Sequence, residues 1–165
     1  MILRAPAPLV PEHRTDDFGC GEPVLDKWLR HRALVNQATE AGRTFVVADG
    51  DRAVLGFYAL AVAAVAHHDA KRAIRQKMPD PDPDPIPVMV LARLAVDLRA
   101  QGMNLGSALL QDALHRTLQV SGNAGVRALL VHALHERARQ FYEHFGFRAS
   151  PSRPMTLMLR IDRKR

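Results

Sequence analysis

The hydrophobic pattern in the first part of the chain predicts a helix followed by a β-hairpin. An apolar stripe at helical spacing, which includes Trp28 and Leu29, predicts an amphipathic helix over residues 21–37. The run TFVVAD at 44–49 predicts a strand, and Asp49-Gly50-Asp51 supplies a turn into a second, longer strand from Ala53 to about Ala66. We therefore expect these two strands to be antiparallel neighbours.

The second part of the chain alternates strands and helices. Its pattern predicts a strand at 88–97, a helix from Gly106 to the Ser121-Gly122-Asn123 stretch, a strand at 127–133, a helix ended by Gly146, and a strand from Met155 to Ile161. Strand 88–97 has one fully apolar face and a second face that carries Arg93 and Asp97. Before it, a basic stretch and the alternating prolines of MPDPDPDPIP predict an extended surface loop. This order predicts an α/β fold with a mixed sheet.

Length and composition indicate a single domain over residues 1–165. The 165 residues, 47% of them hydrophobic, are enough to bury a sizeable core. A single cysteine, Cys20, excludes an internal disulfide and suits a reducing cytoplasm. No export signal or membrane span is expected. Neither His67-His68-Asp69 nor His132, His135 and Glu136 has a recognised zinc spacing, so we expect no metal.

The formal net charge of +6 favours a polyanionic partner. Nucleic acid, a phosphorylated cofactor and an acidic protein all meet that description. A solvated basic face would give the same charge, so the charge alone leaves these alternatives open.

The stretch RAQGMNLGSALL at 99–110 joins strand 88–97 to the following helix. A strand end, a glycine-bearing turn and a helix start bring free N–H groups and the positive end of a helix dipole together, and such a site binds phosphate. An ordinary strand-to-helix turn has the same signature. The stretch has no Walker lysine and no complete dinucleotide fingerprint, so by itself it leaves both interpretations open.

With its neighbours, this stretch resembles the GNAT superfamily of acetyl-CoA-dependent N-acetyltransferases. LARLAVD, the turn that begins at Gln101, SALLQDAL, RALLVHAL and FYEHFGF carry the resemblance. FGCGEPVLDKWLRHRALVNQ, GRTFVVADG and MPDPDPDPIPVMVLARLAVD extend it to the GNAT toxins of bacterial toxin-antitoxin pairs, over nearly the whole chain. The resemblance implies a central, mixed, mostly antiparallel twisted sheet flanked by helices.

The resemblance also implies roles for matching residues. The backbone at Leu94, Ala95 and Val96 is expected to bind the pantetheine arm of acetyl-CoA. The turn that is expected to bind the pyrophosphate contains Gln101, Gly102, Met103, Asn104, Leu105, Gly106 and Ser107. Tyr142 corresponds to the general acid that protonates the departing CoA thiolate. A tyrosine has a pKa of about 10 and therefore stays protonated at neutral pH. Its ring also belongs to an apolar stripe that fits a core role.

The turn departs from the family pattern Gln/Arg-x-x-Gly-x-Gly/Ala. Met103 replaces the arginine that is frequent in this branch, and Asn104 replaces the first signature glycine. Asparagine tolerates left-handed backbone angles and keeps its N–H group, but its side chain occupies space beside the pyrophosphate. We therefore expect weaker binding of acetyl-CoA.

The toxins that this chain resembles acetylate the α-amine of the amino acid on charged tRNA, which blocks translation. An α-amine has a pKa of about 8 and needs only a modest base, so no basic catalytic residue is assigned. The candidate tRNA contacts are Arg32, Asn36, Arg43, Arg93, Lys71, Arg72, Arg75 and Lys77. The resemblance also implies a ribbon-helix-helix antitoxin and a homodimer.

Two alternatives stay open from the sequence. The first is a GNAT enzyme that acts on a protein or small-molecule amine. The second is a catalytically weak GNAT fold that acts as a binding module, which the irregular turn at Met103 and Asn104 keeps under consideration.

Overall fold

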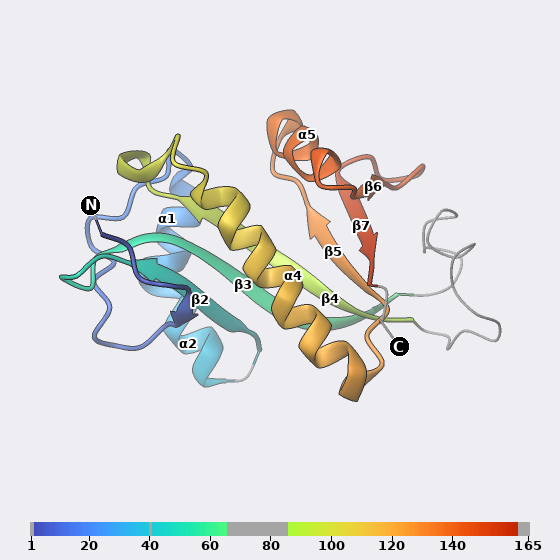
Figure 1. Ribbon diagram of the computed structural model, residues 1–165, viewed down its shortest axis with the longest axis horizontal. Helices are drawn as coiled ribbons and strands as arrows, with labels where there is room; N and C mark the ends of the chain where they lie inside the picture. Colours follow the sequence, from blue (N-terminus) through green and yellow to red (C-terminus); the bar gives the residue numbers. More distant parts are fainter. Residues whose placement is uncertain (1, 40, 66–85, 162–165) are drawn as a thin grey trace. The chain divides into compact units, whose positions relative to one another are not determined.

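The computed structural model describes residues 2–39, 41–65 and 86–161 (Figure 1). Its contacts divide the chain into two compact units, which we call unit 1 (Met1–Ala61 and Ala92–Ala113) and unit 2 (Val62–Leu91 and Leu114–Arg165). The single domain expected over residues 1–165 stays a prediction. Most of the predicted surface loop lies outside the described residues, and its last two residues, Ile86 and Pro87, belong to a strand.

Seven strands form a mixed sheet in the order β1-β2-β3-β4-β5-β7-β6. They are β1 (Ala7–Pro8), β2 (Arg43–Ala48), β3 (Val54–Val65), β4 (Ile86–Val96), β5 (Ala128–His132), β6 (Arg148–Ala149) and β7 (Thr156–Arg160). β4 and β5 pair in parallel, whereas the pairs β1–β2, β2–β3, β5–β7 and β6–β7 are antiparallel. The predicted mixed, mostly antiparallel sheet is confirmed, while the two-residue strands β1 and β6 had no signal in the sequence pattern.

The helices begin and end close to the predicted positions, with one break. They are α1 (Pro23–His31), α2 (Ala33–Ala38), α4 (Leu105–Ala124) and α5 (Glu136–His144), with a 3-10 turn, η2, at Leu98–Ala100. The single helix predicted over residues 21–37 was wrong, because Arg32 leaves the helical range at φ −122° and ψ −27°. Leu29 and Ala33, on either side of the break, are buried in one apolar cluster. Neither glycine nor proline lies at this break, so we attribute the bend to the packing of Leu29 and Ala33 in this cluster.

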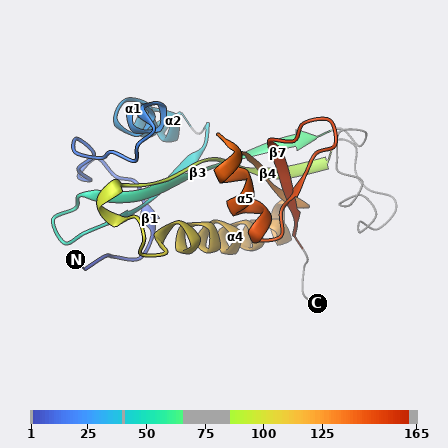
Figure 2. The ribbon, with the colours of Figure 1, turned by 90° about the horizontal axis from the view of Figure 1, so that it is seen from above.

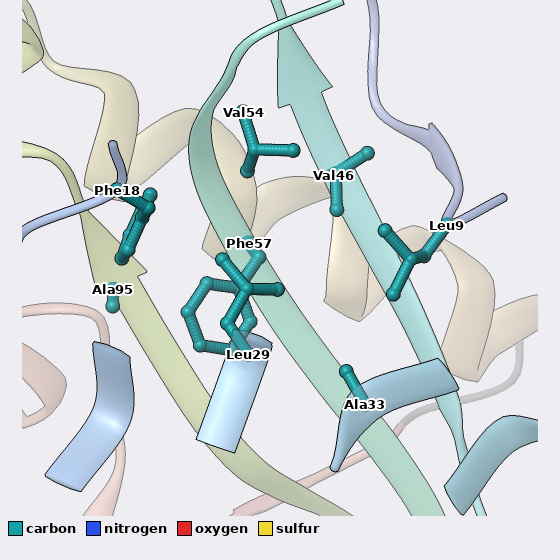
Figure 3. Close-up of a cluster of buried hydrophobic side chains, with 8 residues drawn as sticks. All are labelled: Leu9, Phe18, Leu29, Ala33, Val46, Val54, Phe57 and Ala95. Atoms are coloured by element: carbon teal, nitrogen blue, oxygen red, sulfur yellow. The ribbon is translucent and has the colours of Figure 1, made fainter. Parts of the chain in front are cut away.

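Within unit 1, helices pack on both faces of β3 (Figure 2). On one face Phe57 stacks on Trp28 of α1 and belongs to the same apolar cluster as Leu29 (Figure 3). On the other face a Cβ at Gly56 would lie 3.0 Å from Leu109 of α4, so the glycine permits this close approach. The adjacent residues Gly56 and Phe57 therefore face opposite sides of β3, Phe57 toward α1 and Gly56 toward the first half of α4.

Strand β4 has one face that the sequence predicts to be fully apolar. After Val88, this face is less buried than the opposite face. Leu94 and Val96 of that face are half-buried, whereas Ala95 and Asp97 of the other face are 5% and 2% exposed. The pattern of apolar residues therefore does not identify the buried side of this strand. The half-buried residues Leu94 and Val96 belong to the segment that the sequence predicts to bind acetyl-CoA.

Unit 2 has its own core. Ile86 and Val88 of β4 pack with residues of β5 and β7, including Ala128 and Met158. Helix α5 ends, as predicted, before Gly146, which has a φ of +95°. None of the helices in the described ranges combines the length and hydropathy that a membrane crossing requires.

Candidate active site

The turn between β4 and α4 has the backbone shape that the sequence predicts for it. Gly102 and Asn104 both adopt left-handed conformations, with φ values of +82° and +60°. The expectation that asparagine tolerates this conformation is confirmed, and its carbonyl accepts a hydrogen bond from the Ala108 N–H at 3.1 Å. The turn is exposed from Gln101 to Asn104, and a Cβ at Gly102 would meet no atom within 4 Å. The backbone of this turn is open to a ligand.

Replacing Asn104 by glycine should strengthen acetyl-CoA binding. The change removes the side chain that occupies space beside the pyrophosphate, while glycine keeps the left-handed conformation of this position, and we expect a decrease in Kd of about 3- to 10-fold. Calorimetry on the wild-type protein and Asn104→Gly measures the two Kd values. An equal or higher Kd in the variant would contradict this role for the asparagine. Binding by the variant alone would favour the binding-module alternative for the natural chain.

A buried carboxylate fixes the residue that follows β4 to η2 and to the segment before α1. Asp97 accepts hydrogen bonds from the backbone N–H groups of Gly19 at 2.9 Å and Arg99 at 2.8 Å. The Arg99 guanidinium donates to both carboxylate oxygens, from Nε at 2.8 Å and Nη2 at 3.0 Å. Burial alone would raise the pKa of Asp97, but these hydrogen bonds outweigh it and hold the pKa below its usual value. Asp97 is therefore ionised at neutral pH, and both of its carboxylate oxygens accept hydrogen bonds. It fixes the start of η2.

Tyr142 of α5 combines a buried ring with a free hydroxyl group. Its ring makes edge contacts with Phe141 and Phe147 and is 7% exposed. In the part of the chain that the structure describes, its hydroxyl has no hydrogen-bond partner. Burial raises the pKa of Tyr142 to about 12. The core packing predicted for the ring is therefore present, and the hydroxyl keeps its proton at neutral pH and is available to donate it.

Arg93 of β4 lies over the ring of Trp28 in α1, with 4.2 Å between the guanidinium carbon and the ring centroid. Among the described residues the guanidinium has no hydrogen bond or ion pair. Both side chains are half-buried, and burial lowers the pKa of Arg93, which nevertheless stays charged. Stacking on Trp28 orients this cation while its N–H donors stay available for an anionic ligand. Trp28 was predicted only as part of an apolar helical stripe, because its spacing fitted a core role.

The predicted tRNA contacts of unit 1 continue from Trp28 along the two N-terminal helices. Arg32 donates its backbone N–H to Trp28 at 2.8 Å, and Asn36 donates to Arg32 at 2.8 Å, so each residue lies one turn beyond the last. The Asn36 side-chain amide lies beside Gly42, which precedes Arg43. We call the set Trp28, Arg32, Asn36, Arg43 and Arg93 the basic strip. Three of its members are exposed or half-exposed arginines.

Other predicted contacts and groups take no part in this arrangement. Lys71, Arg72, Arg75 and Lys77 lie outside the described residues. The His135 side chain accepts a hydrogen bond from Ala138 N at the start of α5, and His132 contacts Thr156. Burial raises the pKa of the Cys20 thiol to about 12, so the thiol stays protonated. In unit 1, a hollow of about 610 Å³ shares no residue with the predicted sites and is lined by Arg4, Val10, Glu12, His13, Ala48, Asp49 and Arg52.

Residues 40–149 match the family model described as an acetyltransferase (GNAT) domain. The chain belongs to the GNAT acetyltransferase family. The open turn, the half-buried end of β4 and Tyr142 all lie within the matched residues. The predicted fold and enzyme class are confirmed, whereas the roles of individual residues stay predictions.

The chain is similar to known toxins of this family. It is 50% identical over 142 residues to the tRNA-acetylating toxin of Mycobacterium tuberculosis (strain ATCC 25618 / H37Rv), covering 86% of this chain and 82% of that protein. AtaT complexed with acetyl-methionyl-tRNAfMet has a TM-score of 0.86 at 25% identity, covering 96% and 95% of the two chains. Two further matches at 25% identity cover 96% of this chain. They are AtaTR bound with AcCoA, with a TM-score of 0.82 and 94% of that chain covered, and an AtaT tyrosine-to-phenylalanine mutant bound to the C-terminus of the antitoxin AtaR, with 0.80 and 93%.

Proposed function

We propose that this GNAT enzyme is a toxin that transfers the acetyl group of acetyl-CoA to the α-amine of aminoacyl-tRNA. The observation that carries the proposal is the 50% identity, over most of both chains, to a tRNA-acetylating toxin. The geometry supports it through an open turn for the cofactor and a basic strip for the acceptor RNA. Acetylation of the α-amine prevents the amino acid from forming a peptide bond, and translation stops.

In the proposed reaction the neutral α-amine attacks the thioester carbonyl carbon of acetyl-CoA. A C–N bond forms, and the carbon–sulfur bond breaks with its electron pair on sulfur. The Tyr142 hydroxyl donates its proton to the departing thiolate and becomes a phenolate. The ammonium group loses its proton to water, and the phenolate regains a proton from water, which restores Tyr142. Backbone N–H groups near Leu94 and Val96 stabilise the negative charge that develops on the carbonyl oxygen. Tyr142 belongs to unit 2, whereas the turn belongs to unit 1.

The turn from Gln101 to Ser107 is assigned to the pyrophosphate of acetyl-CoA. Positive φ values at Gly102 and Asn104 suit a concave backbone surface whose N–H groups converge on an anion. The start of α4 adds the positive end of a long helix dipole. Met103 contributes no charge here, so the backbone of this turn supplies the attraction.

The basic strip is assigned to the acceptor end of the tRNA. Phosphates contact arginine as bidentate anions, and unpaired terminal bases stack on aromatic or guanidinium planes. The Arg93 and Trp28 pair offers such a plane, while Arg32 and Arg43 offer exposed charges. An acceptor without phosphates, such as a small amine that is cationic at neutral pH, would gain nothing from this strip.

Reversing the charge of Arg43 should weaken tRNA binding and reduce its salt dependence. Loss of one phosphate contact reduces the slope of log K against log salt by about 0.7 to 0.9. Fluorescence anisotropy with uncharged tRNA at several salt concentrations compares the wild-type protein with Arg43→Glu. Arg153→Glu is the matched control, because Arg153 is exposed in unit 2 and belongs to no proposed site. Equal slopes in the wild type and Arg43→Glu would remove Arg43 from the tRNA site.

A cognate antitoxin, a homodimer and a cytoplasmic location complete the proposal. The complex of AtaT with the C-terminus of its antitoxin supports an antitoxin for this chain. We extend this to a ribbon-helix-helix antitoxin that covers a homodimeric toxin. The cytoplasm is where charged tRNA is used.

The acceptor class is tested by competition. The protein is incubated with radiolabelled acetyl-CoA and equal concentrations of charged tRNA, uncharged tRNA, a lysine-containing peptide and a small primary amine. We expect label in charged tRNA alone. Label in the peptide or the small amine, with none in charged tRNA, would establish the other GNAT alternative, and no label in any acceptor would support the binding module.

A further inference from the structure

The loop at residues 17–20, which we call the 17–20 loop, is separated from α1 by Gly21 and Glu22. Side chains of α1 and of the segment after β4 hold it in place. Arg30 of α1 donates to the Phe18 carbonyl at 2.8 Å, and Asp26 of α1 accepts from the Cys20 N–H at 2.9 Å. The loop is thus fastened to the helix that carries Trp28. A movement of the loop would be a movement of α1 and of Trp28, the member of the basic strip that lies on α1.

The same loop is fastened to the segment between β4 and the cofactor turn. Asp97 accepts from the Gly19 N–H at 2.9 Å, and the Leu98 N–H donates to the Gly19 carbonyl at 2.8 Å. The carbonyl of Cys20 accepts from Nε2 of Gln101 at 3.3 Å. All of these residues belong to unit 1. Successive backbone groups of the loop are therefore bound to one short segment, which ends where the turn begins.

Gln101 makes the last of these connections and also begins the turn. Its Nε2 donates a second hydrogen bond, to the Val96 carbonyl at 3.0 Å. One amide group therefore joins the last residue of β4 to the loop before α1, while the backbone of the same residue leads into Gly102. The side chain is exposed, and these two hydrogen bonds orient its amide group.

We propose that Gln101 is a positioning residue whose side-chain amide couples acetyl-CoA occupancy of the turn to the position of α1 and of Trp28, the member of the basic strip that lies on α1. Pyrophosphate that binds the N–H groups of the turn orders the residue at its start. The amide of Gln101 transmits this order to Cys20, and Arg30 and Asp26 transmit it to α1. The inference rests on the proposed function, because it takes the turn as the acetyl-CoA site and the strip as the acceptor site.

The proposed coupling requires a side chain at position 101 that donates two N–H groups, one to the Cys20 carbonyl and one to the Val96 carbonyl. Gln101→Glu keeps the size and places a carboxylate against two carbonyl oxygens, while Gln101→Met keeps the length and removes every polar atom. Gln101→Arg supplies donors again and should rescue the function. Gln119→Glu is the matched control, because Gln119 is exposed on α4 and contacts His115 of the same helix.

Trp28 is the single tryptophan of the chain, so its fluorescence reports on α1 without labelling. Acetyl-CoA should change the Trp28 emission of the wild type, Gln101→Arg and Gln119→Glu. The change should be lost in Gln101→Glu and Gln101→Met even when each variant is saturated with acetyl-CoA, at concentrations set from the Kd that calorimetry gives for that variant. The kcat/KM for charged tRNA should fall by about 10-fold in the same two variants, since misplacement of a reactant lowers the rate.

The outcomes separate this inference from the proposed function. A Trp28 response that survives in both Gln101→Glu and Gln101→Met overturns the coupling, even if charged tRNA is acetylated. A fall in acetyl-CoA affinity that accounts for the whole loss also overturns it, because Gln101 would then act only on the turn. A Trp28 response that needs Gln101, in a protein that acetylates no charged tRNA, overturns the proposed function alone. No acetyl-CoA binding by the wild type overturns both.

Discussion

Tyr142→Phe should reduce kcat by about 10²- to 10⁴-fold, the usual contribution of a general acid. The hydroxyl is the group lost, and it makes no hydrogen bond in the described part of the chain. The ring contacts with Phe141 and Phe147 stay, so the free energy of unfolding should change by less than about 1 kcal/mol. Single-turnover acetylation measures the first quantity, and urea denaturation measures the second.

The other tyrosine of the chain provides the matched control. Tyr58 is fully buried, and its hydroxyl donates to Asp112, so Tyr58→Phe removes a buried hydrogen bond. This variant should lose stability, by about 1 to 2 kcal/mol, and keep its kcat. If Tyr142→Phe kept most of its activity, or lost activity only in proportion to its folded fraction, Tyr142 would not be the general acid.

Asp97→Ala should lower the free energy of unfolding by about 3 kcal/mol. The change removes the acceptors of the Gly19 and Arg99 N–H groups and leaves a void at a site that is 2% exposed. For a chain of this size the Tm should fall by on the order of 10 °C. Thermal unfolding followed by circular dichroism measures it, and a decrease below about 2 °C would contradict the structural role of this carboxylate.

The contribution of Asp97 should disappear in acid. Its pKa is lowered in the folded state, so the folded state binds the proton less tightly than the unfolded chain. The stability that Asp97 contributes is fully present when the pH is above the ordinary aspartate pKa of about 4. It is lost as the pH falls through the folded-state pKa. The difference in unfolding free energy between wild type and Asp97→Asn should therefore be constant from pH 7 to 5 and shrink below about 4.

The sequence predicts those parts of the site that depend on consecutive residues. The turn from Gln101 to Ser107 follows a strand and precedes a helix, and the left-handed conformation of Asn104 follows from the glycine that it replaces. Tyr142 was identified from a motif within one helix. Local signals of this kind also predicted the hairpin of β2 and β3.

The parts that depend on residues far apart in the chain could not be predicted. Nothing in the spacing of Trp28 and Arg93 indicates that one lies over the other. The hydrogen bonds from Asp97 and Gln101 to the 17–20 loop are visible only in the folded chain. The break at Arg32 has no local signal, because Leu29 and Ala33 satisfy the pattern of a single helix. Tertiary packing determines all three features.

The central claim is that the acetyl group of acetyl-CoA goes to the α-amine of a charged tRNA. The most direct measurement incubates the protein with acetyl-CoA and a pool of charged tRNAs, hydrolyses the ester bonds, and identifies the released amino acids by mass spectrometry. We predict N-acetylated amino acids with the wild-type protein and almost none with Tyr142→Phe. Free, unmodified amino acids from every tRNA, in the presence of a protein that binds acetyl-CoA, would contradict the claim.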